Sequence, residues 1–120
     1  MTKERIMIKL YGIPTCGTVR NARKFFKENE IEIEFIDFKK TSVDCDRVDS
    51  WISGAGLDVL FNNRGTKYRT LKLKDLNLDE AGKREWLCKE NMLFKRPILE
   101  FSGQVIVGFD EEKYNTTFVD

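Results

Sequence analysis

The sequence predicts an α/β fold in two halves, separated by a helical insertion. Residues 6–11 and 31–38 have the apolar patterns of strands, and the residues between them have a helical spacing, which predicts a strand–helix–strand unit. Near the other end, two apolar runs flank a Ser-Gly turn, which predicts a hairpin followed by a short helix. The 120 residues are enough for one domain that folds without disulfides or metals.

A change of hydrophobic period marks the first strand and the first helix. Ile6, Ile8 and Leu10 alternate along the strand, and its other side is partly apolar, so we expect both faces to be buried. Gly12 and Pro14 then stop the strand. The next apolar residues form one stripe of a helix: Val19, Ala22, Phe25 and Phe26.

This arrangement puts Cys16 at the N-terminus of the first helix. The first turn of a helix has unpaired backbone N–H groups and a partial positive charge, so it stabilises an anion such as a thiolate. Arg20 adds a positive charge one turn further on. A free cysteine is also commonly a small buried apolar residue, but the strand, turn, cysteine and helix together favour a nucleophilic thiol.

A second strand and a second helix follow. Residues 31–38 alternate and then run apolar, which predicts a strand. Two strands joined by one helix imply a right-handed crossover and a parallel pair. Residues 44–55 carry apolar side chains on one side at helical spacing, with Thr41 or Ser42 as the expected N-cap.

The middle of the chain, residues 41–91, is expected to be entirely helical. The short apolar run 57–61 predicts a short helix, and residues 66–74 predict irregular or short helical structure. The stretch Asn77-Leu78-Asp79-Glu80 resembles an N-cap with acidic residues in the first turn, so another helix is expected from there to about Glu90.

The end of the chain predicts two antiparallel strands, 96–101 and 104–109, and a short helix capped by Asp110. With the helical insertion set aside, the order is βαβ followed by ββα. This is the thioredoxin-like layout, with its core at residues 1–40 and 92–120.

Composition excludes several classes of site. The 21 basic and 20 acidic residues give a net charge of +1, so no overall field favours direct binding to nucleic acid or to a membrane surface. The chain has no histidine, which excludes His-dependent triads and leaves no plausible zinc ligand set, so no metal site is expected. Three cysteines without a signal sequence indicate a reducing cytoplasm rather than a disulfide framework.

Several short motifs resemble those of one known family. They are Pro14, Cys16-Gly17-Thr18, Arg20-Asn21, Arg64 and Arg96-Pro97-Ile98. Together they resemble the ArsC family, which comprises glutaredoxin-coupled arsenate reductases, YffB-like proteins and Spx-type regulators. The resemblance runs from about Ile8 to Tyr114, includes the insertion and is strongest to the YffB-type branch, which has been proposed to be a glutathione-dependent thiol reductase.

The resemblance implies roles for particular residues. Cys16 is the expected nucleophile, and Arg64 and Arg96 match arginines that hold the oxygens of an oxyanion. Pro97 matches a cis-proline that faces the cysteine. The same resemblance extends anion or substrate binding to the residues that follow the cysteine: Gly17, Thr18, Arg20 and Asn21.

Three departures separate this chain from parts of the family. A third oxyanion-binding arginine of the arsenate reductases falls near Gly108 here, and a histidine of those enzymes is replaced by Gly12. Spx regulators commonly have a second cysteine at the position of Val19. Cys45 and Cys88 remain as resolving cysteines, although both are expected on apolar faces of helices.

Three hypotheses follow from the sequence. The first is a cytoplasmic thiol reductase without a tightly bound cofactor, which uses glutathione as co-substrate, works with glutaredoxin and acts on arsenate or mixed disulfides. The second is an Spx-like redox-responsive regulator that binds the RNA polymerase alpha subunit. The third is a retained fold without activity.

Overall fold

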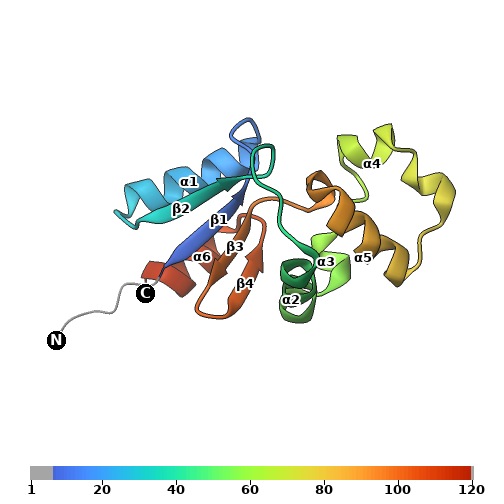
Figure 1. Ribbon diagram of the computed structural model, residues 1–120. Coiled ribbons are helices and arrows are strands. Elements are labelled where there is room, and N and C mark those ends of the chain that lie inside the picture. The colour runs from blue at the N-terminus through green and yellow to red at the C-terminus, as the bar shows by residue number, and fades with distance from the viewer. Residues whose placement is uncertain (1–6, 120) are drawn as a thin grey trace. The chain divides into compact units, whose positions relative to one another are not determined.

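Figure 1 shows the computed structural model of the protein, which describes residues 7–119. Within these residues the chain forms two compact units. The sheet unit comprises residues 7–37 and 96–119, and the helical unit is Phe38–Lys95. None of the helices in the described residues has the length and apolar character needed to cross a membrane.

The sheet unit contains a four-stranded mixed sheet with strand order β2-β1-β3-β4. Its strands are β1 (Ile8–Gly12), β2 (Ile33–Asp37), β3 (Ile98–Phe101) and β4 (Gln104–Val107), and its helices are α1 (Gly17–Glu28) and α6 (Glu111–Tyr114), which a π-helical turn extends over Asn115–Val119. β1 pairs in parallel with β2 and antiparallel with β3, and β3 pairs antiparallel with β4. The predicted α/β fold, with its thioredoxin-like order βαβ then ββα, is confirmed (Figure 1).

One face of this sheet carries the core of the unit. Because side chains alternate along a strand, Ile8 and Leu10 of β1 point to the same face. They pack with the apolar stripe of α1 and with Tyr114 of α6, as well as with Leu99, Phe101 and Ile106. The Tyr114 ring centroid lies 5.5 Å from that of Phe25 and 5.6 Å from that of Phe26. Both helices therefore cover the same face.

The helical unit consists of short helices joined by tight turns. They are α2 (Cys45–Ala55), α3 (Leu57–Leu60), α4 (Thr66–Thr70), the 3-10 turn Leu73–Leu76, α5 (Glu80–Lys89) and the 3-10 turn Asn91–Leu93. Its fully buried apolar side chains are Val48, Trp51, Leu60, Leu73, Leu87, Leu93 and Phe94. The prediction that this part of the chain is helical is correct.

The predicted cap of α2 is wrong. Asp44, and neither Thr41 nor Ser42, is the N-cap residue: its Oδ1 accepts a hydrogen bond of 2.9 Å from the backbone N–H of Arg47. A carboxylate is a full anion, so it complements the positive helix end better than a hydroxyl does.

Within the stretch predicted to begin α5, the structure selects Asp79 and not Asn77 as the cap. Asn77 adopts a left-handed conformation with φ of 46°, which is incompatible with an N-cap and ends the preceding 3-10 turn. Asp79 caps the helix instead, and its Oδ1 accepts a hydrogen bond of 2.8 Å from the Gly82 N–H.

The strands are shorter than predicted, and local chemistry explains two of the ends. β3 begins at Ile98 because Pro97 has no N–H to contribute to a ladder. β4 ends at Val107 because Gly108 has φ of +87°, outside the range of a strand. The strand predicted from Ile6 is observed from Ile8, and Ile6 itself lies outside the described residues.

Candidate functional site

Cys16 lies where the chain leaves β1 and enters α1. It is the N-cap residue of α1, in an extended conformation, and its own N–H donates to the Ile13 carbonyl at 3.3 Å. Its carbonyl accepts the first helical hydrogen bond, from the Arg20 N–H at 3.0 Å. The thiol is free and half-buried, and it packs against the edge of the sheet-unit core. The sequence-based prediction of its position is confirmed.

The first turn of α1 is open to an anion. It contains no acidic residue, and no side chain in the described part of the chain makes a capping hydrogen bond at Cys16. The Nη2 atom of Arg20 lies 4.0 Å from the position that a Cβ on Gly17 would take, so the guanidinium lies over this turn. Backbone donors and a permanent cation therefore lie at the same first turn of α1.

Close packing between Gly12 and Val19 sets the start of α1 against β1. A Cβ on Gly12 would lie 2.6 Å from Val19 Cγ2, closer than real carbon atoms approach. Val19 is fully buried, so its side chain has little room to move away. Glycine at position 12 thus lets α1 begin close to the strand, and Cys16 lies in the short connection between them.

Pro97 lies at the same end of the sheet as the connection to Cys16, where β1 ends and β3 begins. β1 and β3 pair Tyr11 with Ile98, and one further step in this register puts Pro97 opposite Gly12. On its other side, the Pro97 carbonyl accepts a hydrogen bond of 2.7 Å from the Gly108 N–H. The Arg96–Pro97 peptide bond is cis, as the resemblance implies. Gly12, Pro97 and Gly108 therefore form one row across this end of the sheet.

Tyr114 supports this row from the α6 side. Its hydroxyl donates to the Gly108 carbonyl at 2.6 Å, while its ring packs edge-on against Phe25 of α1. Burial raises the pKa of Tyr114 well above its usual range, with a smaller contribution from the charge of Asp110. The sequence shows Tyr114 only as a residue of the last helix, and its tie to Gly108 is visible only in the fold.

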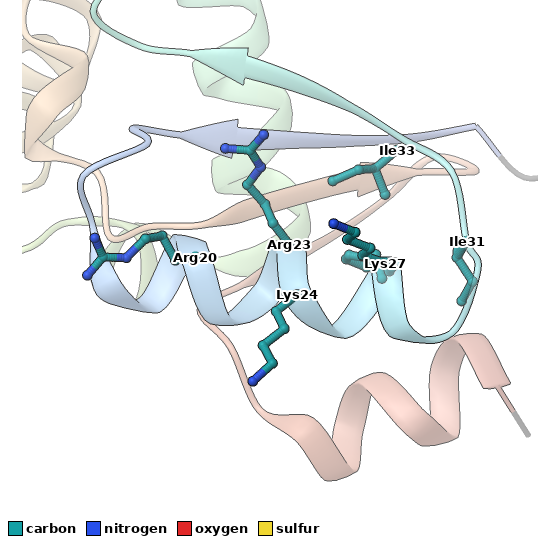
Figure 2. Close-up of a pocket in the computed structure, with 7 residues that line it drawn as sticks. Arg20, Arg23, Lys24, Lys27, Ile31 and Ile33 are labelled. Carbon is teal, nitrogen blue, oxygen red and sulfur yellow. The ribbon is translucent and has the colours of Figure 1, made fainter.

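A basic groove runs along the exposed side of α1 and toward β2 (Figure 2). It is lined by Arg20, Arg23, Lys24, Phe26, Lys27, Ile31 and Ile33. The Arg23 guanidinium lies 4.2 Å from the centroid of the Phe35 ring, which fixes one of these cations over the sheet. The spacing of the four cations, at i, i+3, i+4 and i+7, is the sequence signal for this groove.

The other predicted binding residues lie in different places. Thr18 and Asn21 are exposed on the first two turns of α1, and Arg96 is half-buried directly before Pro97. Arg64 belongs to the helical unit, where it is exposed in the turn before α4. Its N–H donates to Asn62 Oδ1 at 3.0 Å.

The structure joins Cys45 and Cys88 in a disulfide within the helical unit. Both residues are half-buried on α2 and α5, and they are 43 positions apart in the sequence. The sequence indicates a reducing compartment rather than a disulfide framework, and it does not predict the pairing of these two cysteines. Within residues 7–119, no group of three or more cysteine and carboxylate side chains is arranged to hold a metal ion.

Comparison with known proteins gives a family match over most of the chain. The model of the ArsC family matches residues 11–117. An uncharacterised protein of Haemophilus influenzae is 34% identical over 113 residues, which cover 93% of this chain and 99% of that protein.

Solved structures agree. The YFFB protein is 32% identical with a TM-score of 0.84, over 92% of this chain and 97% of that one. A possible arsenate reductase from Streptococcus mutans is 29% identical with a TM-score of 0.75, over 91% of this chain and 98% of that one. A more distant relative is the global transcriptional regulator Spx of Streptococcus pyogenes, 22% identical over 89% of this chain and 81% of its own length.

Proposed function

Since the chain belongs to the ArsC family, we propose that it is a thiol reductase whose nucleophile is the Cys16 thiolate and whose co-substrate is glutathione. One observation carries the proposal: a free, half-exposed thiol at the uncapped N-terminus of a 12-residue helix, with the guanidinium of Arg20 over the same turn. The backbone N–H groups of this turn and the Arg20 guanidinium are donors for the anionic part of a substrate at the turn that carries the thiol, and the thiolate is the reactive form of a cysteine.

The reaction that this site suits is thiol–disulfide exchange. The Cys16 thiolate attacks the glutathione sulfur of a mixed disulfide, so a new S–S bond forms and the substrate leaves as its thiolate. A second glutathione, as thiolate, then attacks the Cys16 adduct, which releases oxidised glutathione and restores the Cys16 thiolate. The substrate thiolate takes up the proton that the attacking glutathione gave up, so the net reaction consumes one glutathione thiol and yields the substrate thiol and one oxidised glutathione.

Positive charge around the site matches the charge of glutathione, which carries two carboxylates. The basic groove begins at Arg20, and its other cations extend along α1 away from Cys16 (Figure 2). We propose that Gly17, Thr18 and Asn21 of the first turns contact the bound anion together with Arg20. Arg96, next to Pro97, is assigned to its carboxylate end.

Mixed disulfides are favoured over arsenate as substrates. The third oxyanion arginine of the arsenate reductases falls near Gly108 in this chain, and Gly108 has a positive φ that a side chain would strain. The loss of one bidentate arginine costs about 1.5–3 kcal/mol of oxyanion stabilisation, which is roughly a ten- to hundredfold slower reaction.

The test is turnover of a glutathionylated peptide by the wild-type protein with reduced glutathione, followed by the release of peptide thiol. The expected result is turnover that Cys16→Ser abolishes, with a transient glutathione adduct on Cys16 detected by mass spectrometry. Failure to turn over the peptide, or an unreactive Cys16 toward iodoacetamide near pH 6.5, would refute the proposal.

A matched pair of charge variants tests the role of Arg20. Arg20→Ala and Lys27→Ala each remove one cation from the exposed side of α1, at its start and in its last turn. Arg20→Ala should lower kcat/KM about three- to tenfold, whereas Lys27→Ala should change it by about twofold or less. Equal effects of the two variants would show that only the overall charge of α1 matters.

Arsenate is the second substrate to test, with glutathione and glutaredoxin as reductants. Comparison of the wild type with Arg96→Ala and Arg96→Lys distinguishes bidentate binding of an oxyanion from simple charge. Arsenate turnover comparable with peptide turnover would reverse the substrate preference proposed above, while leaving Cys16 as the nucleophile.

The alternative function is a regulator that binds RNA polymerase, supported by the match to Spx. A local Cys-x-x-Cys switch is excluded in this chain, because the second position is the fully buried Val19. A pull-down of purified RNA polymerase alpha subunit tests this alternative. Specific retention of the subunit together with no peptide turnover would favour the regulator.

A further inference from the structure

We propose that Cys45 and Cys88 form a second, reversible redox site, which low-molecular-weight disulfides such as oxidised glutathione convert from a dithiol to an intramolecular disulfide. The structure joins the two sulfurs and places the Cα atoms 5.1 Å apart, within the range that disulfides span. This site lies within the helical unit and does not depend on Cys16 or on the function proposed for it.

The fold itself brings the two cysteines together. α2 and α5 run antiparallel in this region, as one side-chain interaction on each side of the cysteine pair shows. Toward the start of α2, the Val43 N–H donates to Asn91 Oδ1 at 2.8 Å. Toward its end, the Arg84 guanidinium binds Asp49 with hydrogen bonds of 2.9 and 2.8 Å. From one pair to the next, the residue number increases along α2 while that of its partner decreases toward the start of α5, as in any antiparallel pairing. The pair of cysteines lies between the other two pairs in this register.

These flanking contacts hold the two helices without the disulfide. Asn91 is buried, with 6% of its surface exposed, and its amide also donates to the Leu87 carbonyl at 2.9 Å, so both ends of the side chain are satisfied. Val48 and Leu87, which are fully buried, add an apolar contribution from both helices. The reduced protein is therefore expected to stay folded with its two thiols close together.

Exposure allows a small reagent to reach the pair. Both cysteines are half-buried, so neither residue is sealed in the core of the helical unit. One thiolate attacks oxidised glutathione, a mixed disulfide forms and one glutathione thiolate leaves. The second cysteine, as thiolate, then attacks its partner's sulfur and displaces the other glutathione. The two protein thiols are oxidised, one oxidised glutathione becomes two reduced glutathione molecules, and the protons of the two protein thiols end on them.

The proposed consequence is a change in the stability of the helical unit. A bond between positions 43 apart restricts the unfolded chain, and this effect increases with the length of the closed segment. The oxidised form should therefore melt about 10 °C or more above the reduced form. In a reducing compartment the pair is a dithiol at rest, and it closes when the ratio of oxidised to reduced glutathione increases.

The experiment uses the full chain with Cys16→Ser, so that Cys45 and Cys88 are its only thiols. The protein is equilibrated in a series of ratios of reduced to oxidised glutathione, quenched with acid, alkylated and weighed by mass spectrometry. Both thiols should disappear together in one two-electron transition, without a lasting glutathione adduct, and peptide mapping should recover the Cys45–Cys88 link. Return to reducing buffer should restore both thiols and lower the melting temperature.

A matched variant, Cys16→Ser with Cys45→Ser, leaves Cys88 alone and should accumulate a glutathione adduct with a much smaller melting shift. Three outcomes would overturn the proposal. They are two cysteines that titrate separately with stable adducts, a link that persists in fully reducing buffer, and a reduced protein that no longer melts cooperatively. The last two would make the bond a permanent structural link. None of them bears on Cys16, because peptide turnover is measured separately with the wild-type protein.

Discussion

A methyl group on Gly12 should displace the start of α1 and with it the catalytic candidate Cys16. In Gly12→Ala the new Cβ would lie 2.6 Å from Val19 Cγ2 and 3.3 Å from Val19 Cγ1, whereas an ordinary carbon contact begins at 3.4 Å. Val19 is fully buried, so the overlap can be relieved only by a shift of helix against strand. Overpacking of this kind costs about 1–3 kcal/mol of unfolding free energy.

The reason for the cost can be tested with a second substitution. Val19→Ala removes both clashing methyl groups, and the Val19 Cβ itself lies at 3.5 Å from the new carbon, an acceptable distance. Alone, Val19→Ala should cost about 2 kcal/mol through lost burial. In the double variant the clash is absent, so the total cost should stay near that of Val19→Ala alone, with a coupling of about 1–3 kcal/mol.

The assay is urea unfolding of the wild type, the two single variants and the double variant, together with the rate of Cys16 alkylation in each. Gly12→Ala should slow alkylation, and the double variant should restore it. Gly17→Ala is the control, because its Cβ has only Arg20 Nη2 within 4.0 Å and should leave stability unchanged or slightly higher. If the loss of unfolding free energy in the double variant equals the sum of the losses in the two single variants to within about 0.5 kcal/mol, the steric explanation is refuted.

Three further predictions concern the scaffold. Tyr114→Phe should lower the free energy of unfolding by about 1–2 kcal/mol, because it removes the hydrogen bond to the Gly108 carbonyl. Because burial raises the pKa of Tyr114, the wild type should also lose stability as the pH rises above about 10. Urea unfolding of the variant should not show this part of the loss. Asp44→Ala should cost about 1 kcal/mol in thermal or urea unfolding, whereas Thr41→Ala should be nearly neutral. The hydrogen bond from Arg84 lowers the pKa of Asp49, so Arg84→Ala should raise that pKa toward its ordinary value in an NMR titration. The small stabilisation of the fold by this exposed pair should be present at neutral pH and lost as the pH falls through the pKa of Asp49. An unchanged Asp49 titration would contradict this last prediction.

Hydrophobic period was enough to predict the sheet unit. The alternation at Ile8 and Leu10 and the stripe that begins at Val19 are strong local signals, and they locate Cys16 between strand and helix to the residue. The caps were harder, because several polar residues precede each helix and only the backbone geometry selects among them. Asn77 shows this: its type suits a cap, but its left-handed backbone excludes that role.

Contacts between distant positions could not be predicted in this way. The hydroxyl of Tyr114 reaches Gly108 only because α6 folds back over the sheet, and no spacing in the sequence indicates that bond. The same is true of Cys45 and Cys88, whose helical faces were predicted while their pairing was not. The basic groove is predictable only in part: its four cations follow a helical period in the sequence, but their proximity to β2 depends on the fold.

The sheet unit is assembled from two stretches of chain with the whole helical unit between them. During synthesis the ribosome releases β1, α1 and β2 long before β3, the neighbour that β1 needs on its other side. One edge of β1 therefore stays unpaired until β3 has been synthesised. The helical unit is continuous in sequence, so all the segments that pack in it are synthesised one after another. We expect the helical unit to become protease-resistant first on the nascent chain and the thiol-bearing turn to take shape only after the last strands have emerged.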